Sequence, residues 1–173
     1  MAGAPTLLGI FTEHIVVGVG DMAVSNNTSQ VISTYALGSC IGVIAYDPIA
    51  EVGGILHFML PDSTLSSEKA QSRPSMFCDV GMKAFLSEFE SMRSKLVNMK
   101  IMIAGGASVI GKSDFFKIGS RNQEAIHAYL GKVNLKAQIQ DLGGLNNRTV
   151  HLNMKDGTVK MKTPTANKKF SLL

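Results

Sequence analysis

Short apolar runs rich in β-branched residues dominate the first third of the chain. They occupy residues 15–20, 31–35, 40–46 and 54–60, and turn-forming pairs such as Asn-Asn, Gly-Ser and Asp-Pro separate them. Short runs of this composition between turn signals predict strands. The run 40–46, CIGVIAY, is apolar at both alternating sets of positions. This pattern indicates a strand that is covered on both faces and therefore lies centrally in a sheet.

The spacing of apolar residues then becomes helical. Residues 61–74 are polar and turn-rich, which predicts a loop, and from Phe77 to Leu96 apolar side chains recur every three or four positions. A second amphipathic helix is predicted after Ser120, which is a good N-cap residue. The sequence therefore predicts two main helices.

Further strands are predicted around the second helix. The run KIMIAGG over 100–106 indicates a buried strand that ends in glycines, and residues 135–141 return to a strand pattern. Residues 148–163 predict a hairpin that turns at Asp156 and Gly157. Because strands and helices do not alternate regularly, we expect an α+β fold with mixed or antiparallel, sandwich-like sheets flanked by the two helices.

Length and composition limit the class of protein. With 173 residues, 45% of them hydrophobic and 17% charged, the chain is expected to form one packed domain over residues 1–163, followed by a flexible tail over 164–173. No apolar run is long enough to span a membrane, and the amino-terminal residues lack the charged start of a secretory signal. The two cysteines predict separate thiols in a cytoplasmic protein.

The net charge of +4 comes entirely from the carboxyl-terminal end. Residues 1–150 hold equal numbers of basic and acidic side chains, whereas residues 151–173 hold five lysines and one aspartate. A nucleic-acid interface needs basic residues gathered on a folded face, preferably with aromatic groups that stack on bases. This chain has a basic end and no tryptophan. We therefore do not expect nucleic acid as a partner.

Cys40 is the first candidate for chemistry. It follows Gly38 and Ser39 at the start of the predicted central strand, where a turn can expose the sulfur and direct backbone N–H groups toward a developing oxyanion. A buried cysteine that only fills space is an equally good explanation of this segment alone.

His57 favours the chemical explanation. The turn between strands 40–46 and 54–60 predicts an antiparallel pair that returns His57 to nearly the level of Cys40. An adjacent imidazole lowers the pKa of a thiol and carries its proton. Thr34 could orient the imidazole as a third member, and Ser33 or Ser39 could serve instead.

Several segments together resemble the CheD family of chemoreceptor glutamine deamidases. The resemblance covers roughly residues 14–163. It is carried by TYALGSC at 34–40, YDP at 46–48, GGILHFMLPDS at 53–63, AGGAS at 104–108, IGSRN at 118–122, DLGG at 141–144 and Arg148.

The resemblance implies hydrolysis of specific glutamine side chains to glutamate in the cytoplasmic helices of methyl-accepting chemotaxis receptors. It maps the nucleophile, the histidine and the threonine of the family onto Cys40, His57 and Thr34. The turn argument adds Gly38 and Ser39 as the oxyanion turn. The resemblance also implies a cysteine-hydrolase fold similar to the catalytic domain of the cytotoxic necrotizing factors, a CheC-type phosphatase as a partner, and no cofactor. A receptor methylesterase and a non-catalytic interaction module remain alternatives.

Other candidates carry weaker signals. Gly105 and Gly106 allow close backbone approach, and the small residues after them could form a rim that grips the substrate. Arg121 and Asn122 could contact the receptor or simply begin the second helix. Cys78 is expected to be structural, His127 to be solvated, and no spacing typical of metal ligands is present. The predicted rim consists of Ala107, Ser108, Val109 and Ile110.

Overall fold

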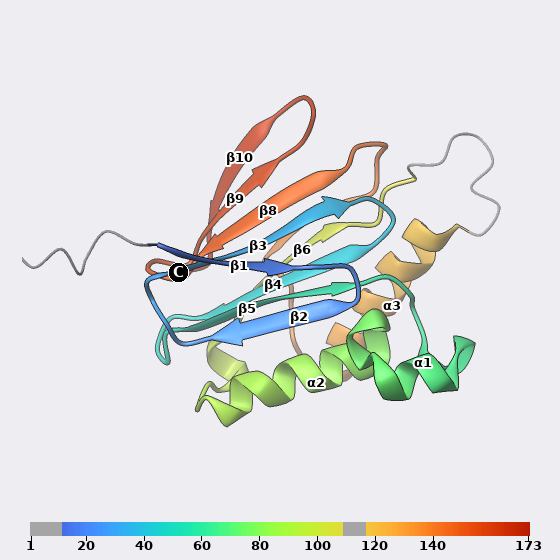
Figure 1. Ribbon diagram of the computed structural model, residues 1–173, viewed down its shortest axis with the longest axis horizontal. Coiled ribbons are helices and arrows are strands. Elements are labelled where there is room, and N and C mark those ends of the chain that lie inside the picture. The colour runs from blue at the N-terminus through green and yellow to red at the C-terminus, as the bar shows by residue number, and fades with distance from the viewer. Residues whose placement is uncertain (1–11, 109–116) are drawn as a thin grey trace, which may run out of the picture.

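The computed structural model describes residues 12–108 and 117–173, which form three layers (Figure 1). Two mixed sheets stack face to face, and the helices cover the outer face of one of them. The sheet without helices, called sheet A below, has the order β1 (Glu13–Val17), β3 (Gln30–Leu37), β8 (Arg148–Asn153), β9 (Thr158–Lys162) and β10 (Asn167–Ser171). The central sheet, called sheet B, has the order β2 (Asp21–Ser25), β5 (Val52–Phe58), β4 (Ile41–Asp47), β6 (Lys100–Gly105) and β7 (Ile139–Leu142).

The predicted fold class is confirmed. β1 runs parallel to β3 and β6 runs parallel to β7, while the other paired strands are antiparallel. Every residue of β4 is buried, as its two-sided apolar pattern predicts, because sheet A covers one face and the helices cover the other. Apolar clusters fill both spaces, with Ile44 and Ile55 between the sheets and Phe85 and Phe89 beneath the helices.

Two main helices lie against sheet B, as expected, but their ends differ from the prediction. α2 (Cys78–Ser91) stops before Leu96, and the left-handed backbone of Arg93, with φ of 66°, reverses the chain. α3 (Ile118–Lys132) begins two residues before Ser120. The polar loop predicted at 61–74 contains a short helix and single turns, namely η1 (Ser63–Leu65), α1 (Ser67–Ser72) and η2 (Pro74–Met76), and η3 (Leu96–Asn98) follows α2.

The predicted strand over 15–20 ends early, because residues 18–20 form a turn. β1 ends at Val17 in sheet A, a turn closes with the N–H of Asp21 donating to the carbonyl of Gly18, and β2 continues in sheet B. Gly20 has φ of 75°, which a side chain would make unfavourable. This turn brings the amino-terminal strands to the end of the sandwich where Thr34 and His57 meet.

The carboxyl-terminal segment differs from the expected flexible tail. Residues 167–171 form β10 on the edge of sheet A, and Leu172 is buried with its N–H donating to the carbonyl of Gly157. Lys168 pairs with Asp141 at 2.6 Å, and the same carboxylate accepts from Arg148 at 2.8 Å. The sequence did not reveal this strand because its lysines give it little apolar alternation. Within the described segments, no helix combines the length and apolarity needed to cross a membrane.

Candidate active site

The pairing of β4 with β5 brings the predicted nucleophile and histidine to the same level of sheet B. Gly42 lies opposite His57 in the antiparallel register, and Cys40 comes two residues before Gly42. Residues two apart share a face of a strand. Cys40 belongs to the apolar cluster between the sheets, and His57 points to the same side, where it contacts Thr34 of sheet A. The predicted antiparallel neighbourhood is confirmed.

Thr34 sets the protonation of the imidazole through two hydrogen bonds. Its hydroxyl donates to the backbone carbonyl of Val17 at 2.8 Å and lies 2.8 Å from Nδ1 of His57. A hydroxyl has only one proton, so once that proton is given to Val17 the oxygen must accept from Nδ1–H. This network therefore selects the tautomer with a free lone pair on Nε2. Nε2 is buried and has no hydrogen-bond partner among the described residues.

The alternative orienting residues do not reach His57. The Ser33 hydroxyl lies on the opposite face of β3 and pairs with Nδ1 of His151 at 2.8 Å. Ser39 lies in the turn before Cys40, and its carbonyl oxygen accepts a hydrogen bond from Asn122. Of the three hydroxyl residues considered from the sequence, Thr34 is the one that contacts the imidazole.

Burial favours the neutral forms of Cys40 and His57. Desolvation raises the pKa of the Cys40 thiol to about 11, although a hydrogen bond from its own backbone N–H acts in the opposite direction. Desolvation lowers the pKa of His57 to about 4, partly countered by the charge of Asp21. From the sequence we expected the imidazole to lower the thiol pKa. The pKa of Cys40 is instead raised, because burial desolvates the thiolate. The resting pair is a thiol beside a neutral imidazole.

This neutrality predicts how Cys40 responds to an alkylating reagent. In a Cys78→Ala background, we expect iodoacetamide to react slowly with Cys40 at pH 7 and about tenfold faster with each pH unit, until the pH approaches the thiol pKa of about 11. Mass spectrometry of the modified protein between pH 7 and pH 10 measures this rate, with glutathione as the reference thiol. A rate that levels off below pH 8 would contradict the raised pKa.

The turn that carries Cys40 is held by the loop after β6. Gly106 N–H donates to the carbonyl of Cys40 and Ala107 N–H donates to the carbonyl of Gly38, both at 2.8 Å. A side chain on Gly105 would come within 2.1 Å of the Cys40 carbonyl oxygen, so only glycine fits there. The two glycines thus serve the close backbone approach that the sequence suggested.

The predicted substrate rim is only partly described by the structure. Ala107 is fully buried, and Ser108 donates its backbone N–H to the carbonyl of Gly144 at 2.9 Å. Val109 and Ile110 lie outside the described residues. The observed contacts of Ala107 are therefore with the Cys40 turn, and the gripping role remains a prediction.

Asn122 contacts the turn that carries Cys40. From the sequence it was expected either to contact the receptor or simply to begin the second helix. It is fully buried, and its Nδ2 donates to the carbonyl of Ser39 at 2.9 Å and to that of Met59 at 2.8 Å. It thereby joins the chain just before Cys40 to the chain just after β5. Its spacing of four from the apolar Ile126 and of eight from Leu130 is the signal that could have placed it on the buried face of α3.

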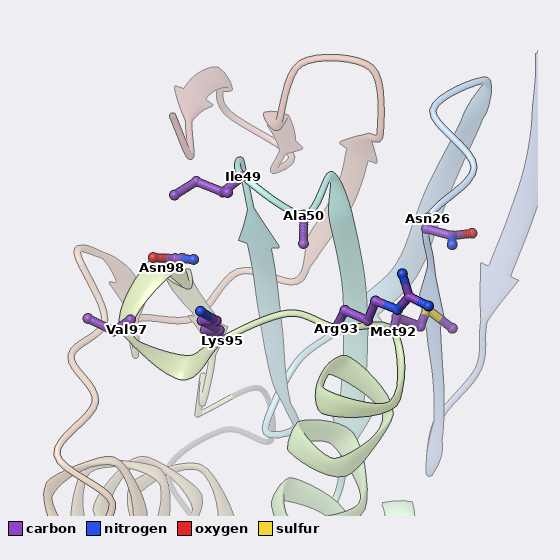
Figure 2. A pocket seen from close by; sticks show the side chains of 8 residues that line it. All are labelled: Asn26, Ile49, Ala50, Met92, Arg93, Lys95, Val97 and Asn98. Carbon is purple, nitrogen blue, oxygen red and sulfur yellow. The ribbon is translucent and has the colours of Figure 1, made fainter.

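Other candidate residues lie away from this site. Cys78 packs in the apolar cluster under the helices, as predicted, and His127 is exposed. Among the residues that the structure describes, no group of three histidine, cysteine or acidic side chains is arranged to hold a metal. Figure 2 shows a surface hollow between the β4–β5 turn at Ile49 and the segment after α2. It lies at the opposite end of β4 from Cys40, roughly 20 Å along the strand, and holds none of the proposed catalytic groups.

Comparisons with known proteins place the chain in one family. Residues 59–163 match the family model described as CheD chemotactic sensory transduction. A protein of Syntrophus aciditrophicus named chemoreceptor glutamine deamidase CheD 1 is 41% identical over 149 residues, which cover 86% of this chain and 93% of the relative. A protein of Solibacter usitatus that is also named a chemoreceptor glutamine deamidase CheD is 40% identical. The match covers 84% of this chain and 86% of the relative. A third, from Pyrococcus abyssi, is 35% identical and covers 87% and 92%.

Among solved structures, the hypothetical protein YfiH of Bacillus licheniformis is similar to this chain at 16% sequence identity and a TM-score of 0.44. The likeness covers 70% of this chain and 49% of that protein.

Proposed function

The chain belongs to the CheD family, and from this membership we propose that it deamidates glutamine side chains of chemotaxis receptors with Cys40 as the nucleophile. One observation supports this assignment most directly. Thr34 orients His57 so that Nε2 is unprotonated, and His57 lies on β5, the strand that pairs with β4 beside Cys40. A deamidase of this type is a protein-glutamine glutaminase. We further propose that the described residues act as one deamidase domain, because sheet B contributes to both apolar clusters.

Acylation follows from the protonation of the resting pair. Because burial keeps the resting thiol protonated, a base must take its proton, and Nε2 of His57 accepts it as the sulfur attacks the carboxamide carbon. The backbone N–H groups at Ser39 and Cys40 stabilise the oxyanion that forms. His57, now an imidazolium, returns the proton to the nitrogen of the substrate. The C–N bond breaks, ammonia leaves, and a thioester to Cys40 remains.

Deacylation uses the same groups. The neutral His57 takes a proton from water, and the resulting hydroxide attacks the thioester carbonyl. The C–S bond breaks, the sulfur recovers a proton from His57, and glutamate is released. Thr34 keeps its hydrogen bond to Nδ1 throughout, so the same nitrogen, Nε2, exchanges the proton in both halves of the reaction.

The test of this function is mass spectrometry of a receptor. A cytoplasmic receptor fragment incubated with the protein is expected to gain about 1 Da at each converted glutamine, because amide hydrolysis exchanges NH for O. Tandem spectra locate the converted positions, and ammonia release should match their number. A receptor fragment that gains no mass while a known deamidase converts it would contradict the proposal.

We place the reaction in the cytoplasm, at the receptor helices that carry the target glutamines. The family resemblance supports a CheC-type phosphatase as a second partner. Co-elution of the two purified proteins in size-exclusion chromatography tests that partnership.

A further inference from the structure

The side-chain amide of Asn122 has only one chemically sensible orientation. Its nitrogen lies 2.9 Å from the carbonyl oxygen of Ser39 and 2.8 Å from that of Met59. Both partners only accept hydrogen bonds, so an amide turned the other way would set its oxygen against two carbonyl oxygens. The two N–H bonds of Nδ2 are therefore fully used, and Oδ1 is fixed in place by them.

Oδ1 of Asn122 is a buried acceptor without a donor. It has no hydrogen-bond partner among the described residues, and the side chain is fully buried. An unsatisfied buried acceptor is costly, typically about 1–3 kcal/mol, which makes a purely structural role for this atom unfavourable. The oxygen shares its carbon with the nitrogen that binds Ser39, and the Ser39 carbonyl is half of the peptide bond to Cys40. The orphan acceptor therefore belongs to a side chain that binds the residue directly before Cys40.

The second orphan acceptor is Nε2 of His57. The tautomer that Thr34 imposes leaves Nε2 with a lone pair, and this atom is as buried as Oδ1 of Asn122. Within the described residues these two side-chain atoms are the buried ones left unpaired. Both side chains lie at the Cys40 end of β4, since Asn122 binds the carbonyl of Ser39 and His57 lies opposite Gly42. The reaction can therefore satisfy both atoms. Nε2 takes the proton of the thiol, which leaves Oδ1 to receive a donor from the substrate.

We propose that Oδ1 of Asn122 accepts an N–H of the substrate carboxamide and so selects an amide over an ester. This inference rests on the proposed function. A glutamine carboxamide offers two N–H donors, whereas a glutamate γ-methyl ester offers none, although both pass through similar tetrahedral intermediates. A site built to pair with a substrate N–H discriminates strongly against an analogue that lacks it, because the buried acceptor is then left unpaired.

The same contact favours release of the product. Once ammonia has left, the glutamate carboxylate is ionised at neutral pH and has only acceptor oxygens. It faces Oδ1 of Asn122, which cannot donate, so the product loses the contact that held the substrate. The acceptor thus distinguishes the substrate from both the ester and the acid.

The test compares two receptor fragments of identical sequence, one with glutamine and one with glutamate γ-methyl ester at the target position. In the Asn122→Ala variant we expect kcat/KM for the amide to fall on the order of 100-fold, while kcat/KM for the ester falls less than fivefold. The amide-to-ester ratio is the informative quantity, since a lost structural contact lowers both rates together. Mass spectrometry follows both reactions.

Ser94→Ala is the matched control. The Ser94 hydroxyl is buried and donates to Asp47 at 2.7 Å, at the far end of β4 from Cys40. Ser94→Ala removes one buried hydrogen bond and Asn122→Ala removes two, but in Ser94→Ala the amide-to-ester ratio should stay at the wild-type value. Thermal unfolding of each variant shows how much stability it has lost.

The outcomes separate the inference from the function on which it rests. Equal losses for amide and ester in Asn122→Ala would overturn the inference while leaving the deamidase function intact. A wild-type protein that hydrolyses neither fragment would overturn the proposed function itself. If Asn122→Ala does not fold, Asn122→Ser keeps a donor for one of the two carbonyls, lacks an acceptor at the position of Oδ1, and should show the same change in ratio.

Discussion

Cys40→Ala is expected to abolish deamidation, with a loss of at least about 10⁴-fold in kcat. No other nucleophile can substitute, because the neighbouring hydroxyl of Thr34 already donates its proton to Val17 and supports His57. The variant should still bind the receptor, since the replaced side chain is almost completely buried. Ammonia release and the mass gain of a receptor fragment measure the loss.

The other buried cysteine provides the control for this substitution. Cys78 is also a buried thiol, and burial raises its pKa to about 12, but it packs under the helices on the other side of sheet B. Cys78→Ala should lower the free energy of unfolding by about 1 kcal/mol and leave deamidation unchanged. Residual turnover above about 1% in Cys40→Ala, or a comparable loss in Cys78→Ala, would rule out Cys40 as the nucleophile.

The local part of the site could be predicted from the sequence. A short turn between two apolar runs dictates an antiparallel pair, and counting from that turn places His57 near Cys40 without knowledge of the rest of the fold. β4 was placed centrally for an equally local reason, namely its apolar residues on both faces. Such inferences succeed because strand pairing across a short turn leaves few alternatives.

The remote part of the site could not be predicted in the same way. Asn122 reaches Ser39 across 83 positions of sequence, and Thr34 receives its second contact from the parallel pairing of β1 with β3. No local pattern encodes either meeting, because each depends on how the two sheets and α3 stack. The closeness of the two strand positions was predictable, yet the sign of the thiol pKa shift was not, since desolvation depends on the packing of the whole sandwich.

Thr34→Val is expected to lower kcat by about 10²- to 10⁴-fold while KM changes little. Valine preserves the shape and the burial of threonine but removes the hydroxyl. Nδ1 of His57 then loses its acceptor, and the carbonyl of Val17 loses its donor. The imidazole can now carry its proton on Nε2, the nitrogen that must accept the thiol proton, and the ring can rotate. Two unpaired buried groups should also lower the free energy of unfolding by about 1–3 kcal/mol.

Two neighbouring substitutions decide whether this loss is catalytic or only structural. Thr34→Ser keeps the hydroxyl and should recover activity to within about tenfold of the wild type. Ser33→Ala removes an equivalent bond, since the Ser33 hydroxyl lies 2.8 Å from Nδ1 of His151, but on the outer face of sheet A. It should reduce stability without reducing kcat. An equal loss of kcat in Ser33→Ala and Thr34→Val would contradict a catalytic role for the Thr34 hydroxyl. Removal of any buried hydroxyl from β3 would then lower kcat, and the Thr34 hydroxyl would have only a structural role.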